Sequence, residues 1–269
     1  MAHTPYLVKP GNESCYEYLQ GCYARISADV GDYAAFVNLD CKTMMSEMFA
    51  DVEKLASFLV KKGIKRGDAI TAFLPTSPHA FIVFYTLSKI GAIANFVHPL
   101  TPPAALKQIL DNTGSRCVFI LDRAVGAYAE VLKDTLTVVC SVSDYTTGRI
   151  KELAKADDDK NSNVPDGDNI YRFADTLNND GEPVPTVEAP GREPAVYLHG
   201  SGTTGKSKTV ILSAQAINNV AYGSAIPTAF AFCPVSIPLE SAAAYIFAPA
   251  TILPELSCRN SIRTRQTNT

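Results

Sequence analysis

Hydrophobic residues recur at helical spacing in some segments of the chain and in short unbroken runs in others. The clearest helical stripe has apolar side chains four, three and four positions apart: Met48, Val52, Leu55 and Leu59. These residues lie on one face of a helix, which Gly63 can end in the left-handed conformation. The apolar run at 69–74 follows this helix and stops at Pro75. A run of this length is typical of a buried strand.

The same alternation of helix and strand continues along the chain. Helical patterns occupy 15–24, 78–90, 102–112 and 124–133, and apolar runs occupy 92–97, 116–121 and 136–140. We expect Thr101 to cap the third of these helices and Pro102 to be its first residue, because hydroxyl side chains favour the cap and proline the first turn. Strands that alternate with helices at this spacing predict a parallel sheet covered on both faces. The predicted fold class is α/β.

The amino-acid composition changes between residues 156 and 194, where Asn, Asp, Gly and Pro become frequent. Asp157 begins a run of acidic residues that resembles a calcium-binding loop, but Ser162 replaces the glycine needed at the sixth position and no glutamate closes the loop. We therefore predict a loop-rich, solvated connector over 156–194. A short apolar strand at 195–198 follows it.

The overall composition is that of a folded protein with nearly balanced charge. Among 269 residues 46% are hydrophobic, and 24 basic side chains stand against 27 acidic ones, for a net charge of −3. This balance gives no electrostatic reason to expect nucleic acid or an anionic membrane as the main partner. The stretch 209–258 contains only two charged residues, but five prolines interrupt it, so we expect buried core rather than a membrane span.

Cysteine and histidine residues show none of the spacings that metal sites require. The seven cysteines are odd in number and include no C-x-x-C pair, which predicts free thiols in a reducing compartment. The start of the chain lacks the regions of a secretory signal, so a cytoplasmic location is expected. His79 and His98 adjoin prolines at predicted turns and are expected to face solvent, whereas Cys117 and Cys140 are expected in the core.

The most informative segment follows the strand at 195–198 and combines small, hydroxyl and basic residues. Its candidate ligand-binding residues are Gly200, Ser201, Gly202, Thr203, Thr204, Gly205, Lys206 and Lys208. Glycines let the backbone approach a ligand and turn its N–H groups inward as an anion nest. Hydroxyl groups add hydrogen-bond donors, and lysine supplies positive charge against phosphate oxygens. We therefore predict that the segment binds phosphate rather than being an ordinary surface loop.

Two known kinds of phosphate-binding loop fit the sequence of this segment. Gly200, Gly205, Lys206 and Ser207 satisfy the Walker A pattern G-x-x-x-x-G-K-[ST]. In that loop a helix begins at the lysine, so that its N-terminus faces the phosphates. Here a β-branched run at 208–212 predicts a strand instead. The predicted order of strand, loop and strand over 195–213 argues against a P-loop NTPase. That function remains the alternative interpretation of the segment.

The order strand, loop, strand is found in another family. The segment resembles the signature loop T-S-G-T-T-G-x-P-K-G-V of the adenylate-forming, or AMP-binding, superfamily, which includes acyl-CoA synthetases, peptide-synthetase adenylation domains and luciferases. Matching positions are Ser201, Gly202, Thr203, Thr204, Gly205, Lys208, Val210, Leu212 and Ser213. Segments 63–68, 74–77, 89–92 and 98–100 resemble further motifs of the family and occur in its order. The resemblance covers residues 16–223, the first half of such an enzyme.

This resemblance implies a fold and an activity. The fold would be the layered, parallel-sheet architecture of the first part of the large N-terminal domain of adenylate-forming enzymes. The activity would be that of an acyl-CoA synthetase-type ligase of fatty acid metabolism: a small-molecule carboxylic acid attacks ATP that carries Mg²⁺, and a thiol such as coenzyme A (CoA) then takes the acyl group. Ser201, Thr203 and Thr204 would hold the β- and γ-phosphates, while Lys206 and Lys208 would offset the charge of the departing pyrophosphate.

Several positions depart from the family's pattern. In the loop, Ser207 stands in place of a proline, Thr209 in place of a glycine and Gly200 in place of a hydroxyl residue, and after it Ala214 replaces a histidine. After Pro234 the later motifs for the acyl pocket, adenine, ribose and the catalytic lysine are absent. We therefore expect 1–234 to be a partial N-terminal AMP-binding domain, 235–269 to be an atypical tail read out of frame, and the C-terminal domain to be absent. Such a truncated chain is expected to be inactive, and a non-catalytic remnant is a further alternative.

Overall fold

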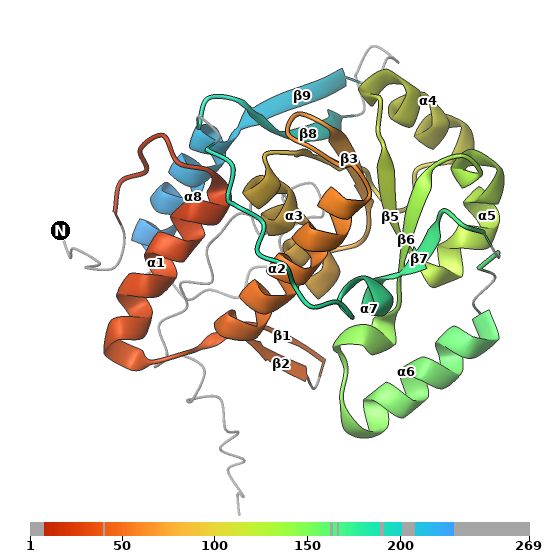
Figure 1. Ribbon diagram of the computed structural model, residues 1–269, viewed down its shortest axis with the longest axis horizontal. Coiled ribbons are helices and arrows are strands. Elements are labelled where there is room, and N and C mark those ends of the chain that lie inside the picture. Colours follow the sequence, from red (N-terminus) through yellow and green to blue (C-terminus); the bar gives the residue numbers. More distant parts are fainter. Residues whose placement is uncertain are drawn as a thin grey trace, which may run out of the picture.

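The computed structural model describes residues 8–39, 41–161, 164–165, 167–188, 191–200 and 208–228 (Figure 1). Its helices are α1 (Cys15–Val30), α2 (Met45–Lys61), α3 (Pro78–Ile90), α4 (Pro103–Thr113), α5 (Asp122–Leu132), α6 (Gly148–Asn161), α7 (Phe173–Thr176) and α8 (Ala214–Thr228), together with the 3-10 helix η1 (Val142–Tyr145). Its strands are β1 (Ala34–Asn38), β2 (Cys41–Met44), β3 (Ala69–Phe73), β4 (Ile93–Phe96), β5 (Cys117–Leu121), β6 (Leu136–Cys140), β7 (Ile170–Arg172), β8 (Pro194–Gly200) and β9 (Lys208–Ser213).

Seven of these strands form one sheet in the order β7-β6-β5-β3-β4-β8-β9, and β1 pairs with β2 in a separate antiparallel ribbon. Neighbouring strands from β7 to β8 are parallel. Among the described strands of the sheet, β9 alone runs antiparallel to its neighbour. The α/β class and the mostly parallel sheet predicted from the sequence are confirmed.

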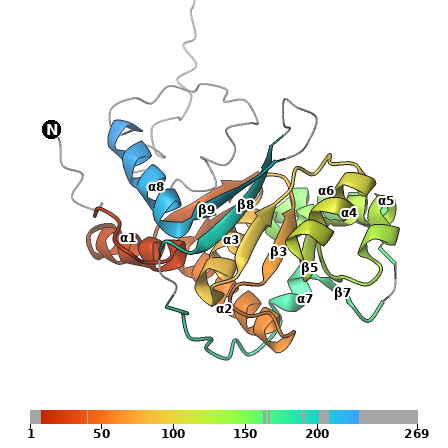
Figure 2. The same cartoon turned by 90° about the horizontal axis from the view of Figure 1, so that it is seen from above.

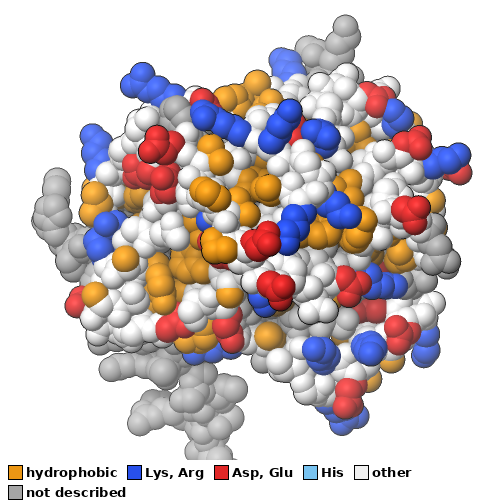
Figure 3. Space-filling view, in the orientation of Figure 1, with side chains coloured by type: hydrophobic (Ala, Val, Ile, Leu, Met, Phe, Trp, Pro, Cys, Tyr) orange, Lys and Arg blue, Asp and Glu red, His pale blue; other side chains and the backbone are white. Residues whose placement is uncertain are grey.

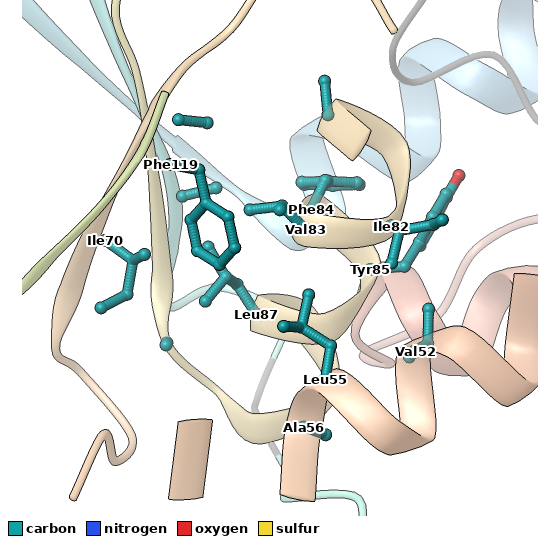
Figure 4. Close-up of a cluster of buried hydrophobic side chains, with 14 of the residues drawn as sticks. Val52, Leu55, Ala56, Ile70, Ile82, Val83, Phe84, Tyr85, Leu87 and Phe119 are labelled. Carbon is teal, nitrogen blue, oxygen red and sulfur yellow. The ribbon is translucent and has the colours of Figure 1, made fainter. Parts of the chain in front are cut away.

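Helices cover both faces of the sheet, and each face has its own hydrophobic core (Figure 2). α1, α2 and α3 pack on one face, where Leu55, Leu87 and Phe119 belong to the larger core (Figure 4). α4 and α5 pack on the other face, where Leu106 and Val125 belong to the smaller core. Full burial of a side chain of this size contributes about 1.5–3 kcal/mol. These two cores hold the sheet rigid between its helical layers.

The predicted elements between residues 45 and 140 are confirmed, with small shifts at their ends. α3 has the predicted limits and ends at Gly91, whose φ of 70° is left-handed. α4 begins one residue later than predicted, since Pro102 rather than Thr101 is the cap and Pro103 is the first helical residue. The ring of a proline keeps the residue before it extended, and Pro102 accordingly has a ψ of 152°.

The predicted connector at 156–194 is wrong at its start. α6 runs on to Asn161, and β7 and α7 follow it before residue 177. Asp158 holds α6 in place, because its Oδ2 accepts a hydrogen bond of 3.2 Å from the backbone N–H of Ser143. The remaining connector crosses α2 and α3: the Asn179 side chain donates to the backbone oxygen of Lys54. Its later part leads back to β8 at the other side of the sheet (Figure 1).

The histidine and cysteine predictions have mixed outcomes. His98 is exposed, as predicted, but the prediction for His79 is wrong: this side chain is only 2% exposed. Its ring lies between those of Tyr145 and Phe173, with centroids 5.0 and 4.7 Å away. Cys117 and Cys140 are fully buried, as predicted, together with other core residues.

The apolar stretch from residue 209 is only partly buried. Ile217 of α8 lies in the core, but Val210 and Ile211 of β9 are 50% and 59% exposed, so the prediction of buried core is wrong for these two residues. The reason is that β9 is the last described strand of the sheet and has a neighbour on one side. Residues 229–258 lie outside the described residues. No helix within the described ranges is long and apolar enough to cross a membrane.

Candidate functional site

The predicted phosphate loop joins β8 and β9, which form a hairpin at one side of the sheet. β8 lies parallel to β4, and β9 lies antiparallel to β8. The register places His199 opposite Thr209, and Gly200 opposite Lys208. Gly200 and Lys208 are therefore brought together at the loop end of the hairpin. The other candidates lie outside the described residues: Ser201, Gly202, Thr203, Thr204, Gly205 and Lys206.

The hairpin bears on the choice between the two kinds of phosphate loop. The strands predicted on both sides of the loop are confirmed as β8 and β9. A Walker A loop needs a helix from its lysine onward, whereas Lys208, two positions after Lys206, already belongs to a strand. The next helix, α8, begins only at Ala214. In the part of this segment that the structure describes, a strand stands where Walker A requires a helix.

The carboxyl end of β8 lies at the same edge of the sheet as the switch point, which is between β3 and β5, where the order of the strands reverses. α3 leads from β3 to β4 on one face, whereas α4 leads from β4 back past β3 to β5 on the other. In open parallel sheets, ligands bind at the carboxyl ends of strands near such a switch point. Leu198 pairs with Phe96, the last residue of β4, so β8 extends beyond β4 at this edge. The loop thus begins at the edge of the sheet where this fold class binds its ligands, with β4 and β3 between β8 and the switch point itself.

His199 joins the base of the hairpin to the sheet. Its Nε2 lies 2.6 Å from Oδ1 of Asn95 on β4, and its Nδ1 lies 3.1 Å from the Thr209 hydroxyl on β9. Burial lowers the pKa of His199 below its ordinary value. The imidazole is therefore neutral at physiological pH, with one nitrogen donating and the other accepting.

The hydrogen bonds continue from Asn95 across the sheet. The fully buried Asn95 side chain donates through Nδ2 to the Thr71 hydroxyl at 2.8 Å. The Thr71 hydroxyl lies 2.7 Å from that of Ser115, which donates to the backbone oxygen of Cys117 at 3.3 Å. Since Asn95 Nδ2 faces Thr71, Oδ1 must accept from His199. The directions of the hydrogen bonds on both sides of Asn95 are thereby fixed.

Sequence reasoning did not find His199, Asn95 or Thr71 as parts of the site. A signal was present, because Asn95 and Thr71 are polar residues inside apolar runs that were predicted as buried strands. A buried polar side chain needs hydrogen-bond partners. Its partners come from other strands, however, and only the order of strands in the sheet identifies them.

A second group of polar residues lies at the carboxyl ends of β5, β6 and β7. Asp122 is buried and accepts a hydrogen bond of 2.8 Å from the Ser141 hydroxyl, and burial raises the pKa of Asp122. A hollow of about 610 Å³ close by is lined by both signs of charge, including Asp158, Lys151 and Arg172. Figure 3 likewise shows acidic and basic side chains interspersed over one face of the molecule. This hollow therefore favours no single class of charged ligand.

Relatives of the chain are enzymes that act with coenzyme A. An acetyl-coenzyme A synthetase of Xanthobacter autotrophicus is 27% identical over 166 residues, which cover 61% of this chain and 25% of that protein. A probable 4-coumarate–CoA ligase of Dictyostelium discoideum is 29% identical over 177 residues, which cover 65% of this chain and 31% of that protein. The chain thus spans about a quarter to a third of the length of these curated relatives.

Solved structures agree on the fold. An anthranilate CoA ligase in complex with anthranoyl-AMP has a TM-score of 0.63 at 14% identity, covering 81% of this chain and 38% of the ligase. The luciferase-like enzyme of the nonluminescent mealworm Zophobas morio has a TM-score of 0.65 at 17% identity, covering 88% of this chain and 52% of that enzyme. The sequence model described as AMP-binding enzyme matches residues 24–250, beyond the boundary predicted at residue 234. The chain therefore belongs to the AMP-binding enzyme family.

Proposed function

We propose that this chain supplies the phosphate-binding part of an AMP-forming acid–thiol ligase. The enzyme would activate a carboxylic acid with ATP as an acyl-adenylate and transfer the acyl group to the thiol of CoA. The observation that supports this proposal most directly is the β8–β9 hairpin, whose loop end lies at the carboxyl edge of the sheet, the edge that also contains the switch point. The segment between its strands carries the glycines, hydroxyls and lysines that suit phosphate.

In this proposal the residues of 200–208 act on the substrate Mg-ATP by position and charge. The hydroxyls of Ser201, Thr203 and Thr204, together with backbone N–H groups, hold the β- and γ-phosphates. Lys206 and Lys208 offset the negative charge that grows on pyrophosphate as the carboxylate attacks the α-phosphate. Mg²⁺ arrives with ATP and shares that charge. None of these groups forms a covalent bond to the substrate.

The proposal also covers the domain boundary, the kind of acid and the setting in which the enzyme works. The domain would be 1–234, with 195–213 as the phosphate hairpin. The acid is a small molecule, as the names acetyl-coenzyme A synthetase and 4-coumarate–CoA ligase suggest for the relatives, and the setting is fatty acid or organic acid metabolism in the cytoplasm. Because those relatives are three to four times longer than the matched part, we expect Mg-ATP binding with little turnover from this chain tested alone.

Isothermal titration of the full chain with Mg-ATP tests this function. The wild type is expected to bind, and Lys208→Ala to bind about 10- to 100-fold more weakly, since a hydrogen bond to a charged group is worth about 1.5–3 kcal/mol. Lys61→Ala is the matched control, because Lys61 is an exposed lysine at the end of α2, which precedes the amino end of β3. Pyrophosphate should compete with Mg-ATP for the wild type. Equal binding by wild type and Lys208→Ala, or no binding at all, would leave the non-catalytic remnant as the better description.

A further inference from the structure

The two strands of the phosphate hairpin are fixed to the interior of the sheet by side chains as well as by their backbones. The row of hydrogen bonds runs from Thr209 through His199, Asn95 and Thr71 to Ser115. It therefore crosses β9, β8, β4 and β3 and ends just before β5. Its first two members are the residues that immediately flank Gly200 and Lys208.

The direction of the bonds on either side of Asn95 follows from its amide group. Asn95 donates through Nδ2 to the Thr71 hydroxyl, which in turn shares a hydrogen bond with the Ser115 hydroxyl. The amide oxygen of Asn95 is then left as an acceptor, so His199 must donate from Nε2 and accept at Nδ1. Only then can the Thr209 hydroxyl donate to the ring. One neutral tautomer of His199 satisfies both neighbours.

We propose that His199 is a positioning residue, which fixes both ends of the phosphate loop relative to the strands at the switch point. This inference rests on the proposed function of 200–208. Residues that are held in place before a ligand binds lower the entropic cost of binding it. Thr209 has a part in this arrangement at a position where the family's usual pattern has glycine, since its hydroxyl gives the ring its second bond.

The geometry also explains why a histidine is suited to this position. The ring presents a donor and an acceptor on different edges, and each reaches a different strand. Phenylalanine has a similar flat ring without either group. Glutamine has a similar reach and can donate from its amide nitrogen and accept at its amide oxygen. His199→Phe and His199→Gln therefore separate the hydrogen bonds from the bulk of the side chain.

Titration of the full chain with Mg-ATP provides the first test. We expect His199→Phe to raise the Kd about 5- to 20-fold, and Thr209→Val about 2- to 5-fold, as the loss of one or two hydrogen bonds predicts. His199→Gln should stay within about threefold of wild type. Val125→Ala, a cavity variant in the core on the other face of the sheet, should lower stability without changing the Kd. That control separates positioning of the loop from a general loss of stability.

The outcomes for the two proposals are distinguishable. If Lys208→Ala weakens binding but His199→Phe and Thr209→Val bind like wild type, the inference about His199 is wrong and the proposed function stands. If His199→Phe does not fold, the exposed Thr209→Val variant decides, because it removes only the bond to Nδ1.

Amide hydrogen exchange keeps the inference testable if the wild type binds no Mg-ATP, in which case the proposed function is wrong. Amides of 199–209 should then exchange at least about fivefold faster in His199→Phe than in wild type, and His199→Gln should restore most of the protection. Equal exchange rates in wild type and His199→Phe would overturn the inference.

Discussion

Nε2 of His79, near the start of α3, lies 2.9 Å from Oδ2 of Asp144 in η1. The same carboxylate oxygen accepts a hydrogen bond of 2.9 Å from the backbone N–H of Ser141, at the end of β6. One carboxylate thus joins α3 to the segment that leaves β6. Because His79 is buried, its ring nitrogen has no access to water if this partner is removed.

Asp144→Ala is expected to lower the free energy of unfolding by about 2–4 kcal/mol, because it leaves two buried donors without an acceptor. Asp144→Asn keeps one oxygen and should cost less. Urea denaturation of the full chain measures both variants. Asp111→Ala, which removes an exposed carboxylate on α4, should change the free energy by less than about 0.5 kcal/mol. An Asp144→Ala variant as stable as wild type would show that the contact with His79 has no stabilising role.

Lys89 is a buried lysine whose charge is balanced by a carboxylate. Its Nζ lies 2.9 Å from Oε1 of Glu53 and 3.2 Å from the Thr186 hydroxyl, above the ring of Tyr16. Lys89→Met keeps most of the apolar stem but leaves Glu53 without its cation, so we expect a loss of about 1–3 kcal/mol.

The pairing of Lys89 with Glu53 can be measured by a double-mutant cycle. Lys89→Met combined with Glu53→Gln should cost less than the sum of the single changes, with a coupling of about 0.5–2 kcal/mol. Urea unfolding of the four proteins gives the coupling. Strictly additive effects would mean that the two side chains act independently.

The stability of the protein should depend on pH through His199. Burial lowers the pKa of His199 in the folded chain below its value of 6.5 in the unfolded chain. Below pH 6.5 the unfolded chain therefore takes up a proton first, and stability falls until the pH reaches the folded pKa. Above pH 6.5 the neutral ring contributes fully. We expect the wild type to lose more stability than His199→Gln between pH 7.5 and about 5.5, as measured by urea unfolding at each pH; parallel profiles would contradict this.

β9 presents apolar side chains at the side of the sheet, and this should promote self-association. Ile211 is 59% exposed on the last described strand, and an exposed edge with apolar side chains can pair with another chain. Ile211→Lys is expected to change stability by less than about 0.5 kcal/mol and to reduce the associated fraction in sedimentation velocity. Val60→Lys, at an exposed position on α2, adds the same charge away from any strand and should leave association unchanged.

Local signals in the sequence were enough to predict the helices and strands on either side of the switch point. α3 could be placed because Pro78 begins it and Gly91 ends it, and both residues act through their own backbone. α6 could not be placed, because it is polar over most of its surface and its run of acidic residues resembles a loop. Its position depends on contacts such as that of Asp158 with Ser143, which lies outside the helix.

Of the candidate site, too, only the parts with a local signal could be predicted from the sequence. The loop was visible from its composition, the strand before it from a short apolar run and the strand after it from a β-branched run. His79 was wrongly expected in solvent, because the neighbouring proline indicated a turn and nothing local indicated Asp144, 65 residues away. The bond between His199 and Asn95 joins residues 104 positions apart. Such pairings depend on the order of strands in the sheet, which no short motif contains.

The long connection from β7 to β8 has a consequence for how the chain folds. Strands β3 to β7 can assemble from neighbouring segments, whereas β8 must return across the molecule to pair with β4, as Val196 does with Ala94. Contacts between residues so distant in sequence form slowly, because a long stretch of chain must first be closed. We therefore expect the hairpin to join the sheet last during folding. The Mg-ATP binding proposed for the hairpin would then require that the whole sheet has assembled first.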